Sequence, residues 1–293
     1  MDQDIWLAER FEQHRPQLRA VAYRMLGSLT EAEDAVQETW LRLARTDADE
    51  VDNLAAWLTT VVARICLNAL RARQTRREES LDVRVPDPVV STADDADPAY
   101  AAVLADSVGL ALLVVLDTLT PTERLAFVLH DLFAVPFDEI GAMMDRSPAA
   151  ARQLASRARR RVQGRAPASD PDLARQREVV DAFLAAAHEG DFDRLVTVLH
   201  PDVVLRSDGG TARARHTTVI TGATAVAAQA ATFGRFSPFA RPALVNGAAG
   251  VLVTAAGRPL SVMAFTVAEG RIAAIDVIAD SERLRQLALD DLS

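Results

Sequence analysis

A cluster of polar side chains in the middle of the chain has the chemistry needed to contact nucleic-acid bases. Arginine can pair with guanine through two hydrogen bonds, glutamine can pair with adenine in the same way, and further arginines can bind phosphates. At helical spacing the cluster occupies one face, and small apolar residues occupy the opposite face. The candidate base-contacting residues are Arg152, Gln153, Ser156, Arg157 and Arg160, and the apolar face comprises Ala151, Leu154, Ala155, Ala158 and Val162.

A helix-turn-helix is the element that would place this face in a DNA groove. The pattern predicts a short helix over 136–144, a turn over 145–147, and a longer helix that begins at Ser147-Pro148 and ends near Gly164. Arg159 and Arg161 lie nearer the rim of that helix and suit phosphate contacts. A solvated basic helix end, favoured by the helix dipole, is the alternative. A helix-turn-helix alone does not distinguish a repressor from other transcription regulators.

A second set of side chains, near the N-terminus, forms one stripe on a predicted helix. Its members are spaced at i, i+3, i+4 and i+7, so they share a face. Because the stripe mixes carboxylates with an apolar side chain, it suits a protein partner; the alternative is an ordinary amphipathic helix. The stripe comprises Asp34, Gln37, Glu38 and Leu41.

Helical periodicity extends over residues 5–77 and is interrupted twice. Gly27 is predicted to end the first helix, and the capping box Thr30-Glu31-Ala32-Glu33 to begin the second. A polar loop over 46–52 separates the second helix from a third, over about 54–73. The apolar positions that support these helices include Leu18, Val21, Ala22, Met25 and Leu26 in the first, Val36, Trp40, Leu41 and Leu43 in the second, and Trp57, Leu58, Val61, Ile65 and Leu70 in the third.

The third helix also carries groups suited to single-stranded DNA. Capture of a single strand needs aromatic or guanidinium faces for stacking, polar groups for base edges and positive charge for the backbone. The helical spacing of Trp57 favours a core position over a stacking role, and both alternatives stay open. The candidates on this helix are Trp57, Arg64, Asn68, Arg71 and Arg73.

Composition limits the classes of function. The chain has 293 residues and a net charge of -9, and all 32 of its basic residues are arginine. An acidic total argues against a free nucleic-acid coat protein, but local arginine clusters can still bind DNA. Cys66 is the only cysteine, which excludes an intramolecular disulfide and a cysteine-based zinc site, and we expect it to be a small core residue. No metal site and no cofactor is expected.

Nothing near the N-terminus is typical of a signal peptide. The first 20 residues mix acids, bases and His14, and the longest apolar run, over 108–116, is too short to span a bilayer. These features predict a cytoplasmic protein with no membrane partner.

Three segments of the sequence resemble the sigma-70 family, specifically its extracytoplasmic-function sigma factors. Glu33 to Leu43 is similar to the region 2 motif, and Ala56 to Asn68 is similar to the family's helix for promoter melting and −10 recognition. Thr120-Pro121-Thr122-Glu123-Arg124, a second capping box, and the helix-turn-helix are similar to region 4. The resemblance covers about residues 5–165, with its parts in the family's order and spacing.

The resemblance implies partners and roles for the residues already named. Asp34, Gln37, Glu38 and Leu41 match the positions that dock on the clamp helices of the polymerase β′ subunit. The family's other contacts with core RNA polymerase include the β flap, and its DNA partners are the −10 and −35 promoter elements. The helix over 54–73 would then act at −10, and the helix after Pro148 at −35.

The last part of the chain has a different pattern, with two predicted helices followed by β-branched runs typical of strands. The helices cover 173–189 and 191–199, and the strands cover 202–206, 217–221, 251–254, 260–268 and 272–277. The stretches 179–183, 189–195 and 199–205 resemble an NTF2-like domain of the SnoaL type, which encloses a pocket. A sigma-factor subgroup carries such a domain as a fused regulator with an Asp-Gly-Gly-Gly-Lys sequence. Asp208, Gly209 and Gly210 match its first three positions, and Asp280-Ser281-Glu282-Arg283-Leu284 stands where the subgroup has Asn-Pro-Asp-Lys-Leu.

The predicted fold class is therefore multidomain: two all-α sigma domains, a region 2 helical bundle and a region 4 helix-turn-helix, followed by an α+β NTF2-like domain. The predicted boundaries are 1–77 for region 2, 78–107 for a flexible acidic linker, 108–165 for region 4, 166–172 for a second linker and 173–293 for the regulatory domain.

The predicted function is promoter-specific transcription initiation, modulated by the chain's own C-terminal domain as an intramolecular partner. Three alternatives stay open. One is a ligand-responsive helix-turn-helix repressor. Another is a DNA-tethered enzyme using Asp208, His216 or Asp276, although we expect no enzymatic activity. The third is a small ligand of unknown identity in the C-terminal pocket.

Overall fold

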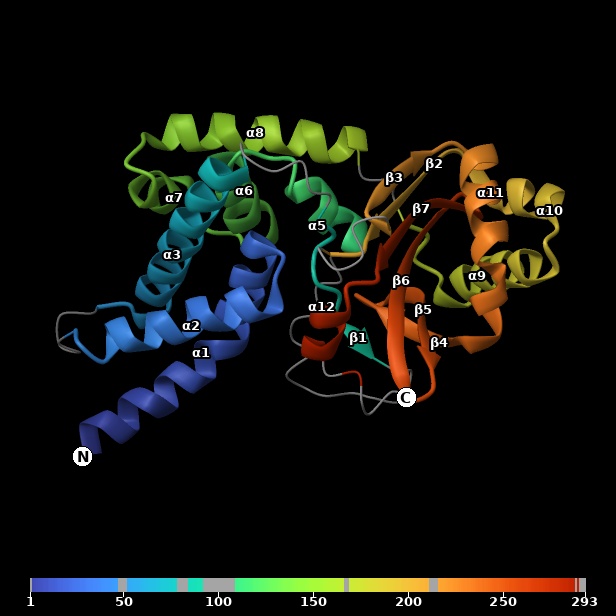
Figure 1. Cartoon of the computed structure of the whole chain (residues 1–293). Coiled ribbons are helices and arrows are strands. Elements are labelled where there is room, and N and C mark those ends of the chain that lie inside the picture. The colour runs from blue at the N-terminus through green and yellow to red at the C-terminus, as the bar shows by residue number, and fades with distance from the viewer. Residues whose placement is uncertain are drawn as a thin grey trace. The chain divides into compact units, whose positions relative to one another are not determined.

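The computed structural model describes residues 2–46, 52–77, 84–91, 109–165, 169–210, 216–287 and 289 (Figure 1). The chain divides into two compact units. The first comprises Met1–Leu81, Pro98–Asp106 and Val115–Arg165, and the second comprises Asp82–Asp97, Ser107–Val114 and Ala166–Ser293. The first unit thus holds the region 2-like segment and the region 4-like segment from Val115 onward, and the second holds the α+β domain together with the start of the region 4-like segment and part of the predicted acidic linker.

The N-terminal helices of the first unit form the predicted bundle. They are α1 (Asp2–Leu26), α2 (Leu29–Leu43) and α3 (Leu54–Arg77), and each packs against the other two. The five apolar residues expected to anchor α1 are all buried, with Val21, Ala22 and Met25 completely so. Gly27 ends α1 as expected, with φ +66 and its N–H donating to the Tyr23 carbonyl.

The start of α2 differs from the sequence prediction. Ser28, two residues before Thr30, is the N-cap of α2. Its hydroxyl accepts a hydrogen bond from the Glu31 N–H. Glu33, expected to complete the capping box, instead forms ion pairs with Arg15 and Arg19 of α1. The predicted capping box is therefore wrong, although the helix itself is confirmed.

The buried face of α3 is also rotated from the predicted one. Leu58, Val62 and Cys66 are completely buried, whereas Val61 and Ile65 are only half-buried. Leu54–Thr75 is long and apolar enough to cross a membrane by length and composition alone. Its completely buried side faces α1 and α2, however, and the opposite side carries Arg64 and Arg71, as in a core helix of a bundle.

The second group of helices contains the helix-turn-helix. Its elements are α5 (Leu110–Leu116), α6 (Pro121–Phe127), the π-helical turn η2 (Val128–Leu132), α7 (Phe137–Met143) and α8 (Pro148–Arg165). The capping box at Thr120 and Glu123 is confirmed in both directions. Ser147 caps α8 through a hydrogen bond from the Ala150 N–H, and α8 packs on α6 and α7.

Two buried arginines join the N-terminal bundle to these helices within the first unit. Arg124 of α6 is 1% exposed, and its Nε donates a 3.0 Å hydrogen bond to the Arg24 carbonyl of α1. It also pairs with Asp117. The Arg24 guanidinium lies 5.1 Å from the centroid of the Phe133 ring. Charged groups therefore form the centre of this contact.

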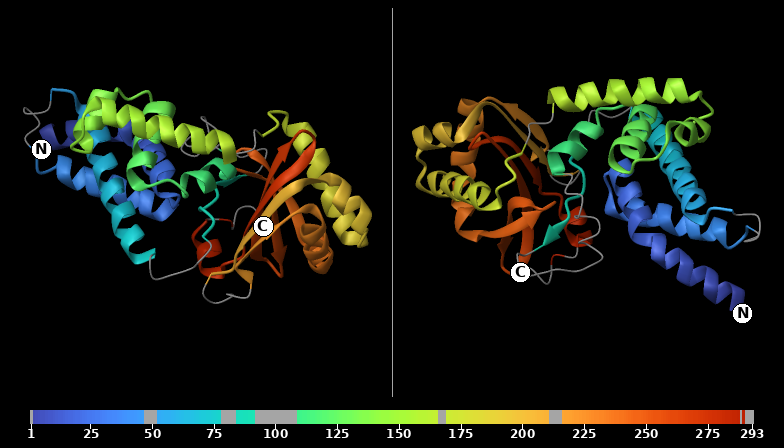
Figure 2. Two further views of the ribbon diagram at one scale, coloured as in Figure 1. Left: turned by 90° about the horizontal axis from the view of Figure 1, so that it is seen from above. Right: turned by 180° about the vertical axis from the view of Figure 1, so that it is seen from behind.

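The second unit is a curved sheet with helices on both sides (Figures 1 and 2). One side is covered by α9 (Leu173–Glu189), α10 (Phe192–Val198), α11 (Ala223–Phe233) and the 3-10 turn η4 (Gly234–Phe239), and α12 (Ser281–Gln286) packs on β6 from the other. The strands are β2 (Leu199–Asp208), β3 (Thr218–Thr221), β4 (Ala240–Val245), β5 (Ala248–Ala255), β6 (Arg258–Ala268) and β7 (Arg271–Ile278).

The sheet has the order β1-β4-β5-β6-β7-β2-β3, and every pairing except the parallel β2–β7 pair is antiparallel. Its core joins Phe183 of α9 and Val226 of α11 to Val251, Phe265 and Ile275 of the sheet. All five predicted strands are confirmed. The elements α11, α12 and β4 were not predicted from the sequence, and together they complete the α+β architecture expected for an NTF2-like domain.

The additional edge strand β1 (Val90–Ser91) comes from the predicted acidic linker. It pairs antiparallel with β4, with Val90 opposite Val245 and Ser91 opposite Leu244. The expectation of a flexible linker is therefore wrong for residues 84–91, which are bound to the second unit. Residues 78–83 and 92–107 of that linker lie outside the described residues.

Candidate functional site

The candidate DNA-recognition face of α8 is open to solvent. Every side chain expected to contact bases is exposed, and the predicted apolar face is buried apart from the half-buried Val162. The Arg152 guanidinium lies 5.2 Å from the centroid of the Phe137 ring of α7, so a cation–π contact holds it at the start of the helix. The exposed set comprises Arg152, Gln153, Ser156, Arg157 and Arg160.

Other arginines of α8 have partners inside the unit. Arg159 forms a 2.6 Å ion pair with Asp131 of η2, and Arg161 forms one of 2.8 Å with Glu123 of α6. Arg157 lies 3.5 Å from the same Glu123 carboxylate but keeps 52% of its side chain exposed. Arg159 and Arg161 thus fasten α8 to its own domain, a role that the sequence did not indicate.

The candidate polymerase-binding stripe lies on the solvent side of α2. Asp34, Gln37 and Leu41 are exposed, and Leu41 is 44% exposed although it is apolar. Glu38 is half-buried and pairs with Arg42 at 2.9 Å, one turn along the helix. An exposed leucine flanked by carboxylates is the arrangement expected of a surface that binds another protein.

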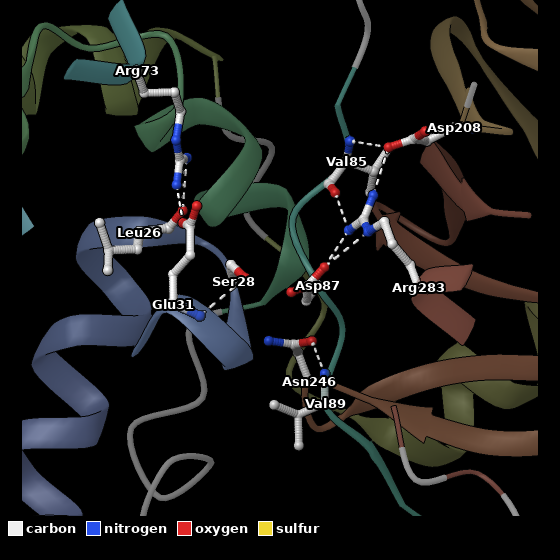
Figure 3. A network of polar contacts seen from close by, with 11 residues as sticks. Leu26, Ser28, Glu31, Arg73, Val85, Asp87, Val89, Asp208, Asn246 and Arg283 are labelled. Carbon is white, nitrogen blue, oxygen red and sulfur yellow. Dashed lines mark hydrogen bonds and ion pairs between the residues drawn. The ribbon is translucent and has the colours of Figure 1, made fainter. Parts of the chain in front are cut away.

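The candidate −10 residues of α3 do not form one group. Arg64, Asn68 and Arg71 are exposed and follow one another at i, i+4 and i+7. Arg73 lies elsewhere: only 13% of its side chain is exposed, it pairs with Glu31 of α2, and it donates to the Leu26 carbonyl (Figure 3). Trp57 is half-buried.

One member of that exposed α3 face is already bound within the first unit. Nη2 of Arg64 donates a 3.1 Å hydrogen bond to the Ala142 carbonyl of α7. A candidate −10 residue therefore contacts the helix-turn-helix. Cys66, on the buried side of α3, is sealed in the bundle, and burial raises the pKa of its thiol to about 12. The thiol is therefore protonated at neutral pH, in agreement with a core role.

The acidic linker is clamped to the second unit by Arg283 of α12 (Figure 3). The Arg283 guanidinium donates to the Val85 carbonyl at 2.6 Å and to the Asp87 carboxylate at 3.0 Å, and pairs with Asp208 of β2 at 2.6 Å. Only 16% of the Arg283 side chain is exposed, and the two carboxylates are more deeply buried. We call the contacts of residues 85–91 with the rest of the second unit the linker clamp.

Asp208 is the central acceptor of the linker clamp. Its Oδ2 accepts the 3.2 Å hydrogen bond from the Val85 N–H as well as the bond from Arg283, and its Oδ1 accepts from the Gly210 N–H at 3.0 Å. Gly210 has φ +62, and a Cβ there would meet the Asp280 carboxylate. The Gly209 N–H donates to Thr217. The Asp208-Gly209-Gly210 sequence thus shapes the turn that presents the carboxylate to the linker.

The β4–β5 hairpin holds the other end of the clamped segment. Asn246 and Gly247 form its tight turn with φ +50 and +76. The Asn246 side-chain oxygen accepts from the Val89 N–H at 3.0 Å, and the Asn246 N–H donates to the Val89 carbonyl at 2.8 Å (Figure 3). An Asn-Gly pair is a hairpin indicator, so the missed strand β4 could have been found from the sequence.

The three residues considered for acid–base catalysis do not meet. Asp208 belongs to the linker clamp, and Asp276 forms a 3.0 Å ion pair with Arg206. Burial raises the pKa of Asp276, and the neighbouring Arg206 opposes that shift. Of the three, His216 alone lines the cavity of the second unit. Among the residues that the structure describes, no group of three or more His, Cys, Asp or Glu side chains could hold a metal ion.

Comparison with protein families matches two segments of the chain. Residues 10–76 match sigma-70 region 2, and residues 109–162 match sigma-70 region 4. The candidate residues of the stripe on α2, of α3 and of the recognition face of α8 all lie inside these matches.

Individual relatives agree with these matches. The chain is 48% identical over 201 residues to the ECF RNA polymerase sigma factor SigJ of Mycobacterium tuberculosis, covering 68% of this chain and 64% of that protein. It is 36% identical over 223 residues to the probable ECF sigma factor SigI of the same species, covering 76% and 75%. The crystal structure of Mycobacterium tuberculosis SigJ superimposes with a TM-score of 0.77 at 36% identity, over 96% of this chain and 99% of that one.

Proposed function

The chain belongs to the extracytoplasmic-function RNA polymerase sigma factors, and we propose that it uses α2 to bind core RNA polymerase, α3 and α8 to recognise the −10 and −35 promoter elements, and its C-terminal unit to restrain that activity. The observation that carries the proposal is the pair of exposed faces on α2 and α8 within the two matched regions. The site of action is the cytoplasm, where bacterial polymerase and promoter DNA are found. The C-terminal unit acts as a regulator and catalyses no reaction.

The stripe on α2 supports polymerase binding because most of its side chains remain open to solvent in the described part of the first unit. Asp34 and Gln37 are exposed and Leu41 is 44% exposed, whereas the opposite face of α2 is buried in the bundle. We assign the partner as the clamp helices of the polymerase β′ subunit, with the β flap as the partner of the region 4 helices. A repressor that binds duplex DNA alone would have no use for this stripe.

The test is run-off transcription with purified bacterial core polymerase on a promoter library. Asp34→Arg together with Glu38→Arg should lower the specific transcripts at least tenfold, because repulsion replaces attraction at the docking surface. Glu9→Arg, a charge reversal at an exposed position of α1, is the matched control and should transcribe normally. Normal transcription by the double variant would refute the docking assignment, and duplex binding without any transcription by the native chain would indicate a repressor.

Promoter binding requires the first unit to open. The −10 and −35 elements are about 25 base pairs apart, roughly 85 Å along B-DNA. In this structure the two sigma regions touch through Arg24 and Arg124, and Arg64 of α3 is bound to α7. Because α3 is assigned to −10 and α8 to −35, the two regions would have to separate for their helices to reach both elements. We therefore infer that this joined arrangement is a closed state of the sigma factor.

The linker clamp supports a restraining role for the C-terminal unit. The clamped residues 85–91 lie between region 2 and region 4 in the chain, so the C-terminal unit is fixed to the connection that both regions need in order to separate. Only six residues lie between the end of α3 and residue 84, a reach of about 25 Å. Release of the clamp would free residues 84–91 of that connection.

Clamp variants test this restraint in the full-length chain. Arg283→Gln should raise promoter-specific run-off transcription several-fold, because it removes the cation shared by Asp87 and Asp208. Arg285→Gln, on the exposed side of the same helix, should have no effect. Unchanged or reduced transcription by Arg283→Gln, with the protein folded, would contradict the restraining role and leave promoter recognition as a separate question.

A further inference from the structure

The C-terminal unit contains a cavity with a volume of about 500 Å³. It lies between the inner helices and the sheet, with walls from α9, α11, η4 and the strands. Folded interiors rarely leave voids larger than a water molecule. A cavity of this size falls within the range of ligand sites, about 300–1,000 Å³. Its chemistry can therefore be used to infer an occupant.

Most of the cavity wall is apolar. Aliphatic side chains come from the sheet and from α9, and aromatic side chains come from α9, α11 and η4. Burial of a matching apolar surface would be the main source of affinity. The apolar residues that carry this argument are Phe183, Leu205, Phe233, Phe236, Leu260 and Met263.

The polar side chains of the described wall are few. They are the hydroxyls of Ser207, Thr218 and Ser261, the Gln229 amide and the His216 imidazole. No Asp, Glu or Arg is among the residues that line the cavity in the described part of the chain. Among these described residues a ligand with a full charge would find no fixed carboxylate or guanidinium as a counterion, and burial of an unpaired charge is strongly unfavourable. The wall thus favours an uncharged ligand that makes one or two hydrogen bonds.

Strand alternation explains why the buried charges of this unit stay outside the cavity. Leu205 and Ser207 of β2 and Val277 of β7 point into it, so their neighbours Asp208 and Asp276 point to the other face of the sheet. A substrate in the cavity would therefore meet neither carboxylate. This geometry favours a receptor site over a catalytic one.

Three rings lie together on one side of the cavity. The His216 and Phe233 rings are 6.1 Å apart in an edge arrangement, and the Phe233 and Phe236 rings are stacked at 6.3 Å. Phe233 is 37% exposed, which is unusual for a phenylalanine in a core. Aromatic faces of this kind bind flat rings by stacking or by edge contacts.

We infer that this cavity is a receptor site for a neutral, mostly apolar small molecule that contains at least one flat ring, and that its occupancy is transmitted to the linker clamp. The transmission rests on the proposed restraining function. Ser207 of the cavity wall immediately precedes Asp208 of the clamp, and the Asp208 carbonyl accepts a 2.8 Å hydrogen bond from Ala279, another lining residue. A ligand that shifts these strand ends shifts the carboxylate that holds Arg283 and Val85.

Binding is tested on the purified full-length chain with two probes that differ by one charged group. N-phenyl-1-naphthylamine is neutral, and 1-anilinonaphthalene-8-sulfonate has the same rings and an added sulfonate. Fluorescence titration should give a Kd at least tenfold lower for the neutral probe. Equal or tighter binding of the sulfonate would overturn the neutral class, and failure of both probes to bind would overturn the receptor site.

Cavity-filling variants locate the bound probe. Ala230→Trp on α11 and Leu260→Trp on β6 fill the cavity from two sides, and each should weaken binding of the neutral probe at least tenfold. Ala228→Trp adds the same side chain to the exposed side of α11 and should bind normally. Thermal unfolding identifies a variant that does not fold, and the second filling variant then decides. Normal binding by a folded filling variant would place the probe elsewhere and overturn the site.

Coupling to the clamp is tested by reciprocity. If occupancy alters the clamp, breaking the clamp must alter the affinity of the cavity by the same factor. Arg283→Gln should change the Kd of the neutral probe at least fivefold, and Arg285→Gln should leave it unchanged. An unchanged Kd in Arg283→Gln would refute the transmission. Neither titration involves polymerase or DNA. A negative titration would therefore refute the receptor site alone, whereas the promoter function is tested separately by run-off transcription.

Discussion

Replacement of Arg283 by Gln should release residues 84–91 from the second unit without unfolding it. The arginine makes charge-assisted hydrogen bonds to Asp87 and Asp208 and donates to the Val85 carbonyl. Its loss would remove the Arg283 cation from both carboxylates, which are 11% and 8% exposed at the side chain. Removal of one partner from a buried ion pair costs about 3–5 kcal/mol. We take about 3 kcal/mol, because glutamine keeps one donor, and this corresponds to a change of roughly a hundredfold in the docking equilibrium.

Hydrogen–deuterium exchange measures this release directly. The Val85 and Val89 amides are protected by the Asp208 and Asn246 side chains, so a peptide that spans 84–91 should exchange roughly a hundredfold faster in Arg283→Gln. Peptides from β5 and β6 should exchange as in the native chain. Arg285→Gln is the matched control, since Arg285 lies on the exposed side of α12 and its Nε donates to the Ser281 carbonyl of its own turn.

Two results would refute this reasoning. Unchanged protection of 84–91 in folded Arg283→Gln would show that β1 and the Asn246 contacts hold the linker without the arginine. Equal loss of protection across the whole second unit would show that Arg283 stabilises the fold and not a separable clamp.

Two further predictions follow from the recognition helix and from the buried carboxylate. Arg152→Ala and Gln153→Ala should each weaken discrimination at −35 by about 1–3 kcal/mol, measured by competition binding of the polymerase holoenzyme to promoter variants. Arg177→Ala, at an exposed position of α9, is the control. An unchanged promoter preference would remove both residues from the recognition face. Because the pKa of Asp276 is raised on folding, its stabilising contribution is present at low pH and is lost as the pH rises through that folded-state pKa. The unfolding temperature of Asp276→Asn should therefore rise relative to the native chain as the pH is raised above about 4, the ordinary pKa of an aspartate, and a pH-independent difference would contradict this assignment.

The helical parts of the fold could be predicted because their patterns are local. Along α8, buried and exposed residues recur at helical spacing with few exceptions. The Thr120 cap lies three residues from its partner Glu123. The rotation of α3 could not be predicted, because apolar residues surround most of that helix and the pattern fits several buried faces. Ser28 was missed because two hydroxyl residues lie within three positions, and only the backbone geometry selects one of them.

The linker clamp could not be predicted from the sequence for a different reason. Arg283 and Asp87 are 196 residues apart, and no local pattern connects them. The acidic, proline-containing composition of the linker indicates flexibility, and only the tertiary structure shows that Val90 and Ser91 extend a sheet and that Val85, Asp87 and Val89 are bound beside it. In the same way, the arginine side chains of Arg73, Arg159 and Arg161 are of the type expected to contact DNA. Each instead forms an ion pair inside the first unit.

The contact between the two sigma regions has a consequence for how the protein behaves when it opens. Arg24 and Arg124 are almost completely buried there, together with the Asp117 carboxylate. On separation these groups would regain their hydration shells, and this gain offsets much of the interaction that is lost. A junction centred on charges can therefore separate in water without exposing a large apolar surface that would aggregate. The open chain would then stay in solution long enough to bind its polymerase.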